Sequence, residues 1–295
     1  MSTAPDAQAL GKVGVWASGL RLSEASEVSE AAAELEQLGY GTAWVPGIAN
    51  PGTVAAFEPL LDATGDLVVA SGIVNIWVED ADDVAAEFAQ VERAHPSRSL
   101  VGVGVSHRPL IGERYQRPLV AMREFLDRLD QGENVIDAEH RLLAAIGPKS
   151  LELARQCSRG SHPYLMPPEH TAIAREALGE DKLLAPEQTV LLETDPGRAR
   201  ERGRESLAIY LGLPNYMDNL RRVLGLSDDD FADGGSDRLV DATIAWGDEE
   251  AIRHRIDEHL EAGADHVCIQ VPVPLDDLSA LPRDDWRRLA PALVD

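Results

Sequence analysis

Residues 67–107 decide the fold. They contain LVVASGIVNIWV at residues 67–78, ADDVAAEFAQVERA at residues 81–94 and SLVGVGV at residues 99–105. The first and third segments are apolar or small at almost every position, rich in β-branched residues and interrupted by glycine, as in parallel strands that are covered on both faces. The middle segment has the length and composition of a helix. We therefore predict a strand–helix–strand unit of a parallel sheet.

The rest of the chain continues this alternation. Strands are predicted at residues 12–17, 42–45, 142–146, 161–165, 183–192 and 266–271, with helices between them; one helix spans residues 23–38, with Ser23 as its N-cap. Residues 195–247 are too long for one crossover and contain helical stretches. The pattern predicts a single α/β domain over residues 1–295, a (β/α)8 TIM barrel with a helical insertion at residues 195–247, between strands 7 and 8.

The composition excludes several classes of partner. The formal net charge is −24, from 51 acidic and 27 basic residues, whereas binding to nucleic acid or to an anionic membrane needs a basic surface. The sequence has no signal peptide and no apolar run of transmembrane length, so we expect a cytoplasmic protein. The eight histidines show no metal-binding spacing, and the two cysteines are expected to be reduced thiols.

Candidate site residues come from the loops that follow the strands, because the chemistry of such barrels lies at the C-terminal strand ends. Three tryptophans fall there, and we expect them to line a substrate site: Trp16, Trp44 and Trp77. Packing of the barrel core is the alternative for each of them. The glycines in the first and second strands of the unit permit either tight helix packing or a flat ligand across the strand ends.

Several familiar motifs are absent. GVGVSH at residues 102–107 lacks the third glycine of the Rossmann fingerprint, and the sequence contains no GxSxG, P-loop or HExxH. Metal-dependent hydrolysis and acyl transfer therefore have no support.

Five stretches together resemble the bacterial luciferase-like monooxygenase superfamily, and within it the branch of F420-dependent oxidoreductases. They are EAAAELEQLGYGTAWVPG (30–47), VVASGIVNIW (68–77), HPSRSLVGVGVSH (95–107), AAIGPKSLELA (144–154) and GSHPYLMPPEH (160–170). The resemblance implies a non-prolyl cis peptide bond at Gly72–Ile73 that backs the ring of a deazaflavin. It also implies further cofactor contacts from Asn75, Val105, Ser106, Ile146, Gly147, Ser161 and His162.

The cofactor F420 carries an anionic tail, so its site on an acidic protein should be locally basic. Candidates are the start of the helix at Pro148, where free backbone N–H groups can bind an anion, and the side chains of Lys149, Arg108, Arg114 and Arg117.

The chain also departs from the family. Some relatives have a catalytic histidine after strand 2, where this chain has Gly47 and Ile48, and a glutamate after strand 4, where it has His107. The acid/base pair of the members that oxidise sugar phosphates is therefore missing. His107 becomes the catalytic candidate, because imidazole titrates near neutral pH; a purely hydrogen-bonding role is the alternative.

The resemblance implies an oxidoreductase that transfers a hydride between F420 and a small organic substrate, and the tryptophans suggest an apolar or conjugated one. An FMN-dependent monooxygenase and a non-catalytic flavin-binding barrel are the alternatives. The family also suggests a homodimer.

Overall fold

The computed structural model describes residues 3–47 and 50–294, and every strand pairing in it is parallel. The strands are β1 Val13–Trp16, β2 Thr42–Val45, β3 Val68–Ser71, β4 Val74–Asn75, β5 Ser99–Gly104, β6 Arg141–Leu143, β7 Gly160–Ser161, β8 Leu183–Leu184, β9 Glu187–Leu192, β10 Ile244–Gly247 and β11 Val267–Gln270. Along the sheet their order is β10-β9-β11-β1-β2-β3-β5-β6-β7-β8, and β4 pairs with β5.

The barrel closes through residues 183–187, which join β7 to β11. The amide of Ala185 donates to the Ser161 carbonyl (2.9 Å), and the amide of Cys268 donates to the Pro186 carbonyl (2.8 Å). Strands β8 and β9 are thus one strand, interrupted where Pro186 supplies no N–H to the ladder. The predicted (β/α)8 barrel is confirmed.

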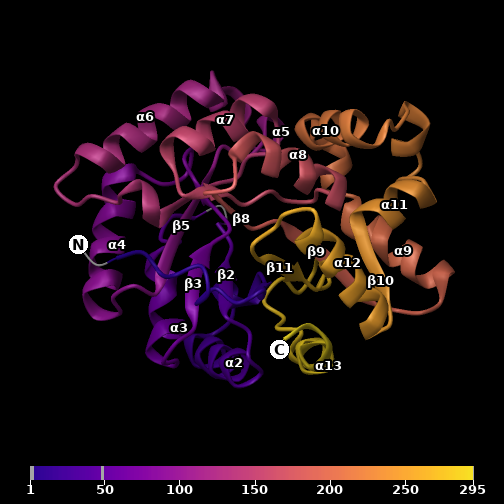
Figure 1. Ribbon diagram of the computed structural model, residues 1–295, viewed down its shortest axis with the longest axis horizontal. Helices are drawn as coiled ribbons and strands as arrows, with labels where there is room; N and C mark the ends of the chain where they lie inside the picture. Colours follow the sequence, from indigo (N-terminus) through magenta and orange to yellow (C-terminus); the bar gives the residue numbers. More distant parts are fainter. Residues whose placement is uncertain (1–2, 48–49, 295) are drawn as a thin grey trace.

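Helices surround the sheet (Figure 1). They are α1 Gly19–Leu22, α2 Ala25–Gln37, α3 Glu58–Asp62, α4 Ala81–Ala94, α5 Arg108–Ile111, α6 Pro118–Gln131, α7 Pro148–Cys157, α8 Pro168–Leu178, α9 Pro196–Leu207, α10 Pro214–Leu224, α11 Asp237–Thr243, α12 Glu249–Glu261 and α13 Arg283–Leu293. Short 3₁₀ turns lie at η1 Ala55–Phe57, η2 Gly112–Arg114, η3 Ala138–His140, η4 Tyr210–Gly212 and η5 Asp228–Phe231.

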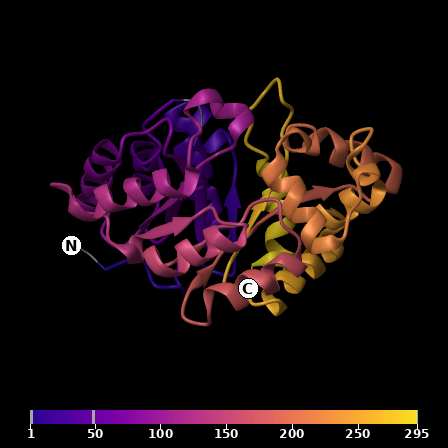
Figure 2. The same cartoon turned by 90° about the horizontal axis from the view of Figure 1, so that it is seen from above.

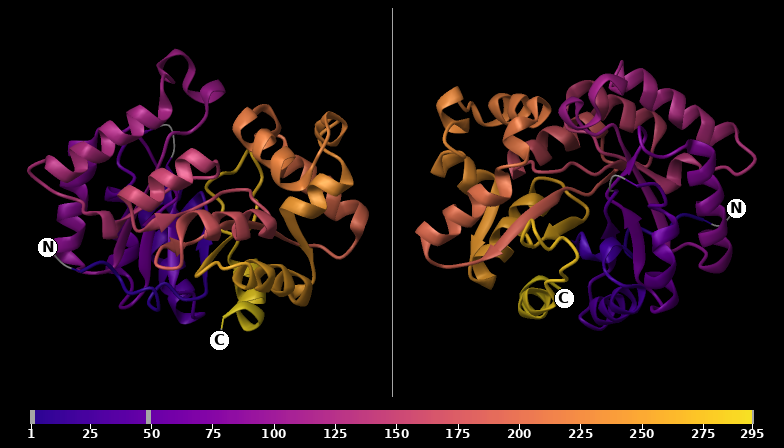
Figure 3. Two further views of the ribbon diagram at one scale, coloured as in Figure 1. Left: turned by 45° about the horizontal axis from the view of Figure 1, so that its top comes forward. Right: turned by 180° about the vertical axis from the view of Figure 1, so that it is seen from behind.

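The chain between β9 and α12 stands beside the barrel, as Figures 2 and 3 show in orange. It contains α9, α10 and α11 and ends in β10, which pairs with β9 from Ile244–Thr189 to Gly247–Leu192. These helices pack Leu207, Leu220 and Leu239 into a second apolar core that also contains barrel residues such as Ile146 and Leu191. The predicted helical stretches are present in this segment. Strand β10 was not predicted.

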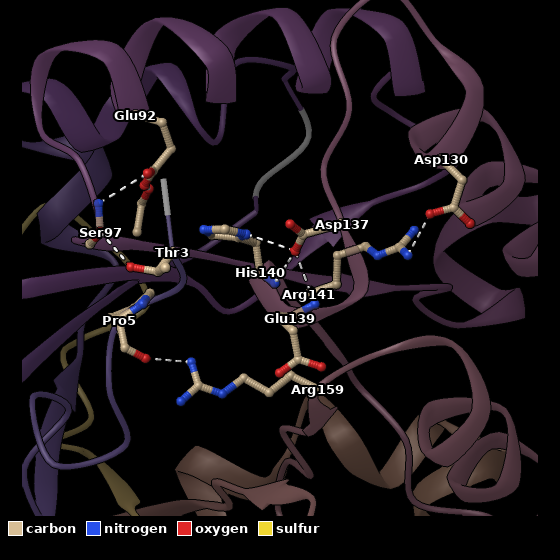
Figure 4. A network of polar contacts seen from close by, with 11 residues as sticks. Thr3, Pro5, Glu92, Ser97, Asp130, Asp137, Glu139, His140, Arg141 and Arg159 are labelled. Atoms are coloured by element: carbon tan, nitrogen blue, oxygen red, sulfur yellow. Dashed lines mark hydrogen bonds and ion pairs between the residues drawn. The ribbon is translucent and has the colours of Figure 1, made fainter. Parts of the chain in front are cut away.

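The N-terminal segment covers the other end of the barrel. Leu10 is fully buried inside the barrel, among side chains from β2, β3, β5 and β6. Figure 4 shows the polar contacts nearby: Arg159 donates to the Pro5 carbonyl (2.7 Å), and the buried Arg141 pairs with Asp130 (2.7 Å). The functional end of the barrel is therefore the opposite one, where the strands end.

Two local expectations were wrong. The strand predicted to reach Val78 ends at Asn75, because a turn follows in which the amide of Val78 donates to the Asn75 carbonyl (2.9 Å). Ser23 is not the N-cap of its helix: α2 begins at Ala25 after Glu24, and the Ser23 hydroxyl donates to the Ser279 carbonyl (2.5 Å) instead.

Candidate functional site

A cavity of about 610 Å³ lies at the C-terminal ends of β1, β2, β9 and β11, between the barrel and α9. Its walls include Trp16, Leu191 and Tyr210, together with apolar side chains of residues 271–278. This volume lies in the range of small-molecule sites, and the lining is mostly apolar with a few polar groups, as such sites usually are.

Trp16 connects this cavity to the interrupted strand β3–β4. Its indole Nε1 donates to the Gly72 carbonyl (2.8 Å), and the Gly72–Ile73 peptide bond is cis, as the resemblance implied. A Cβ atom on Gly72 would lie 2.9 Å from the Trp16 ring, and one on Gly47 would lie 1.9 Å from the Ile73 carbonyl oxygen. Only glycine allows these close approaches.

The other two predicted tryptophans lie elsewhere. Trp77 is half-buried, and its Nε1 donates to the Val105 carbonyl (2.7 Å), while its amide donates to Asn75 Oδ1 (3.1 Å). Trp44 is fully buried inside the barrel, and its ring stacks on His162 with centroids 4.1 Å apart. Among the predicted site residues, only Trp16 lines the cavity in the described part of the chain.

His162 belongs to the barrel interior. Its Nδ1 lies 2.7 Å from the Ala185 carbonyl oxygen, so this nitrogen carries the proton and Nε2 is the acceptor. In the described part of the chain Nε2 has no hydrogen-bond partner, and a Cβ atom on Gly72 would lie 3.1 Å from it. Burial lowers the His162 pKa to about 4, so the imidazole is neutral at pH 7. The neighbouring Ser161 hydroxyl is bonded to the Leu143 carbonyl (3.0 Å).

Three tyrosines cover the barrel mouth beside the cavity. The Tyr164 hydroxyl lies 2.6 Å from the Tyr210 hydroxyl and donates to Gln270 Oε1 (2.6 Å). The Tyr216 ring packs against both tyrosines, and its centroid lies 4.5 Å from that of His107. Sequence reasoning missed Tyr210 and Tyr216, since both come from the insertion and follow no barrel strand.

His107 is half-buried against this group, next to Ser106. In the described residues its buried Nδ1 has no hydrogen-bond partner, and burial lowers its pKa to about 4. A neutral imidazole accepts one hydrogen bond and donates one, so at pH 7 His107 can act as a hydrogen-bond acceptor and a weak base, but not as a charged acid.

The anion site is predicted at the end of β6 and the start of α7. The Ile146 carbonyl accepts hydrogen bonds from His170 Nε2 (2.8 Å) and, at 3.4 Å, from Arg222 Nη2. The amide of Gly147 donates to Ser150 Oγ (3.1 Å). Arg222 comes from α10 in the insertion, so the strand-end rule could not find it. It adds a cation to a helix N-terminus.

The four predicted cations do not cluster at this place. Arg114 donates to the Trp77 carbonyl (3.1 Å), and Lys149 lies in a groove between α6 and α7. Arg108 is exposed in α5, and Arg117 precedes α6 in a left-handed conformation. Ile48, the second residue at the departure after strand 2, lies outside the described residues.

A buried carboxyl group lies behind the cavity and was not predicted. Glu187, at the start of β9, is 1% exposed, and its Oε1 accepts from the Thr189 hydroxyl (2.7 Å) while its Oε2 accepts from the Leu165 amide (3.0 Å). Burial raises its pKa to about 7. Thr189 lines the cavity. The strand predicted at residues 183–192 contains Glu187, but the sequence did not show that this side chain is buried.

The described residues contain no group of three or more His, Cys, Asp or Glu side chains that could hold a metal ion. No helix among those residues has both the length and the apolar character needed to span a membrane.

Comparisons with known proteins agree with this architecture. A solved F420-dependent secondary alcohol dehydrogenase, in complex with an F420–acetone adduct, is 18% identical, with 100% of both chains covered and a TM-score of 0.68. The coenzyme F420-dependent tetrahydromethanopterin reductase of Methanopyrus kandleri is 16% identical, covering 96% of this chain and 98% of its own, with a TM-score of 0.73.

An FMN enzyme is similar to the same degree. The oxygenating constituent of 3,6-diketocamphane monooxygenase from Pseudomonas putida, in complex with FMN, is 12% identical, covering 96% of this chain and 99% of its own, with a TM-score of 0.67. At these identities the likeness concerns the fold. No curated protein matches the sequence. The family model of luciferase-like monooxygenases matches residues 9–266, most of the chain, and the protein therefore belongs to the luciferase-like monooxygenase family.

Proposed function

We propose that this protein is an F420-dependent oxidoreductase that transfers a hydride between the deazaflavin and a small, apolar or conjugated organic substrate. The observation that carries the proposal is the largely apolar cavity of about 610 Å³ at the C-terminal strand ends, with Trp16 in its wall. Enzymes with this barrel place their chemistry at this end.

The residues at the barrel mouth suit a flat ring. Glycine at positions 47 and 72 lets neighbouring groups approach the backbone closely: the Ile73 carbonyl at Gly47, and the Trp16 and His162 rings at Gly72. Four buried imidazole nitrogens lack a partner in the described residues, and two of them, His107 Nδ1 and His162 Nε2, belong to residues that the resemblance assigns to the site and would accept a hydrogen bond from a ring N–H group. A buried polar atom usually has a partner, so both nitrogens support a ligand nearby.

The cofactor, when bound, would supply the redox chemistry, and the protein would supply orientation, exclusion of water and a route for the proton. Trp16, held by its bond to the Gly72 carbonyl, would orient the ring from the side of the cavity. His107, neutral at pH 7, would accept a proton or a hydrogen bond at Nδ1. The N-terminus of α7 and Arg222 would bind the anionic tail.

A titration of the purified protein with F420, and separately with FMN, tests the proposal. We expect F420 to bind and to be reduced or oxidised in the presence of a generic acceptor or donor. Binding of FMN alone, with oxygen consumption, would instead identify a monooxygenase. Binding of F420 without turnover of any acceptor would favour the non-catalytic, cofactor-storing barrel.

Two neighbouring arginines provide a matched pair of variants. Arg222→Gln removes the cation beside Ile146, and we expect it to weaken F420 binding about tenfold, as for the loss of one charge-assisted hydrogen bond. Arg221→Gln is the control, because Arg221 points to Asp218 and Asp228 instead. The difference between the variants should shrink at high salt. Equal affinities at low salt would remove Arg222 from the site.

We also propose a homodimer, which the family resemblance suggests. Light scattering of the purified protein tests it, and a monomeric mass would contradict it.

A further inference from the structure

One polar pair in the cavity wall has no role in the function proposed above. Thr189 is a polar lining residue of the cavity and is 4% exposed, and its hydroxyl donates to Glu187 Oε1 (2.7 Å). The surrounding cavity wall is largely apolar, whereas the exposed Arg202 and Glu205 belong to α9 at its outer side. The Thr189 hydroxyl is satisfied by this bond, but a buried carboxyl group is costly to keep, and this one lies one hydrogen bond away from the cavity.

We propose that Thr189 binds the reacting oxygen of the substrate, a carbonyl or hydroxyl group on an otherwise apolar molecule, and that Glu187 exchanges the proton which this oxygen gains or loses. The inference rests on the proposed function, because it concerns the substrate of that reaction. Thr189 is the residue in contact with the substrate, and Glu187 acts through it.

The hydrogen bonds around Glu187 determine where its proton lies. The Leu165 amide has a hydrogen only to donate, so Oε2 must accept from it in either protonation state. In the protonated acid the hydrogen is therefore on Oε1, which faces Thr189. The carboxyl then donates to the Thr189 oxygen, and the hydroxyl hydrogen of Thr189 becomes free to point into the cavity. Protonation of Glu187 thus turns Thr189 from a donor to the carboxylate into a donor to the substrate.

The surroundings of Glu187 favour the protonated acid. The groups that face it are Tyr164 and Tyr210 at the barrel mouth, Tyr216 on α10 and Cys268 on β11. Burial raises the pKa of each of these groups, so all four are neutral at pH 7. With these neutral neighbours and without water, the carboxylate is poorly stabilised, and burial raises the pKa of Glu187 to about 7. A group with a pKa near the working pH can both give and regain a proton.

A second polar pair at the cavity favours a substrate oxygen in the same corner. The Tyr164 hydroxyl donates to Gln270 Oε1, so the hydroxyl of Tyr210 must donate to Tyr164 across their 2.6 Å contact. Tyr164 therefore bonds only to the amide oxygen of Gln270 and not to its amide hydrogens. Gln270 lines the cavity. Gln270 and Thr189 lie on neighbouring, directly paired positions of β11 and β9. Both can donate to one carbonyl oxygen.

The proton balance is complete in either direction. When a hydride from a reduced flavin or deazaflavin forms a C–H bond at the carbonyl carbon, the C=O π bond breaks and the oxygen takes the Thr189 hydroxyl proton. The Thr189 oxygen takes the proton of Glu187 Oε1. After the product leaves, water in the cavity protonates the Thr189 hydroxyl as Thr189 passes its own proton back to the carboxylate, because Thr189 lines the cavity and Glu187 does not. In the direction of alcohol oxidation, each transfer is reversed and the oxidised cofactor accepts the hydride.

Infrared difference spectroscopy tests the inference without cofactor. We expect a protonated carboxyl band that disappears on titration through neutral pH in the wild type and is absent from Glu187→Gln. Glutamine keeps an acceptor for Leu165 and a donor to Thr189, so the fold should survive. Glu193→Gln, on the loop after β9, is the control and should keep the band. A band that is the same in Glu187→Gln would overturn the inference.

The probe cyclohex-2-enone, labelled with 13C at its carbonyl, tests the role of Thr189. Hydrogen bonding should lower the carbonyl stretching frequency of the bound probe in the wild type, and Thr189→Val should bring it back toward the unbonded value. An unchanged frequency in Thr189→Val, or no binding of the probe to the wild type, would overturn the assignment of a carbonyl site.

The pH dependence of the hydride step, measured in single turnovers with the bound cofactor, completes the test. We expect Glu187→Gln to lower the rate of the hydride step about 100-fold, which is the size typical for loss of a general acid. The variant should also abolish the change of this rate near neutral pH. Thr189→Ser should keep the wild-type profile and Thr189→Val should not. If neither F420 nor FMN binds, the proposed function fails, while both infrared measurements still decide the state of Glu187 and Thr189. If cofactor binds but the profile of Glu187→Gln is that of the wild type, the inference alone fails.

Discussion

Replacement of Glu187 by glutamine should change how the stability of the protein depends on pH. The Glu187 carboxyl is 1% exposed, and burial raises its pKa from 4.5 to about 7 in the folded protein. Between these two values the unfolded chain has lost the proton while the folded protein still holds it. The folded state then binds more protons than the unfolded state, so the free energy of unfolding falls as pH rises through this window.

The size of the effect follows from the difference in pKa. Each pKa unit corresponds to about 1.36 kcal/mol, so a difference of about 2.5 units is worth roughly 3 kcal/mol, lost between about pH 4.5 and pH 7. Glutamine at this position does not titrate. We therefore expect the free energy of unfolding of Glu187→Gln to equal that of the wild type within about 1 kcal/mol near pH 5. Near pH 8 the variant should be more stable than the wild type by roughly 3 kcal/mol.

The difference between variant and wild type is the informative quantity, because five buried or half-buried histidines add a pH dependence of opposite sign. They are His107, His162, His170, His259 and His266, and burial lowers the pKa of each. Their contribution to stability is complete above the unfolded pKa near 6.5 and is lost as pH falls toward 4. It is present in both proteins and cancels.

Urea unfolding at a series of pH values from about 5 to 8 measures this difference. Glu193→Gln is the control: the bond to Arg198 lowers the Glu193 pKa to about 2, so its titration lies below the range of the experiment. A difference between Glu187→Gln and wild type that stays constant over the whole range would refute the reasoning, because it would mean that Glu187 is ionised throughout.

Further predictions concern the barrel rim and the surface. Gly47→Ala would place a Cβ atom 1.9 Å from a carbonyl oxygen of the β3–β4 segment, so we expect a loss of about 1–3 kcal/mol by chemical denaturation; Gly65→Ala, with no atom within 4 Å, should cost less. Arg141→Ala removes a buried guanidinium from its hydrogen bonds to Asp130 and the Leu126 carbonyl and should cost about 1–3 kcal/mol, because the Asp130 carboxylate that remains is half-exposed. Arg128→Ala breaks only exposed pairs and should cost at most about 1 kcal/mol. If His107 is the catalytic base, the rate should fall only as pH drops toward 4 and not near 6.5, and a fall near 6.5 that is lost in His107→Gln would contradict the lowered pKa of this imidazole.

Local signals in the sequence were sufficient where an element is determined by its own residues. Helix α4 spans Ala81–Ala94 as predicted, and Asp80 caps it by accepting from the Asp82 amide. Helix α7 begins at Pro148 as predicted, because proline suits the first helical turn. In both cases the start of the helix depends on residues next to it in the chain.

Local sequence signals could not predict contacts between segments that are distant in the chain. Strand β10 exists because Ile244–Gly247 pairs with β9, more than 50 positions earlier, and its four residues carry no strand signal that stands out among helices. The strand-end rule placed Trp44 at the rim, but its side chain lies one layer deeper, stacked on His162. Which layer of a barrel a residue occupies depends on strand stagger, which residue types do not reveal.

The insertion shapes the site more than the barrel strands alone suggest. Tyr210 and Tyr216 come from η4 and α10, pack against Tyr164 and His107, and interact electrostatically with the buried Glu187. Without this cover the carboxyl would be hydrated, and its pKa would return to the ordinary range, because desolvation is the main cause of the shift. The same insertion contributes Arg222 to the end of β6 and α9 to the wall of the cavity. In the proposed function, the barrel rim would hold the flat cofactor, and we expect the insertion to influence the protonation state of Glu187. A change confined to the insertion should alter the pH dependence of the reaction even though it leaves every barrel strand intact.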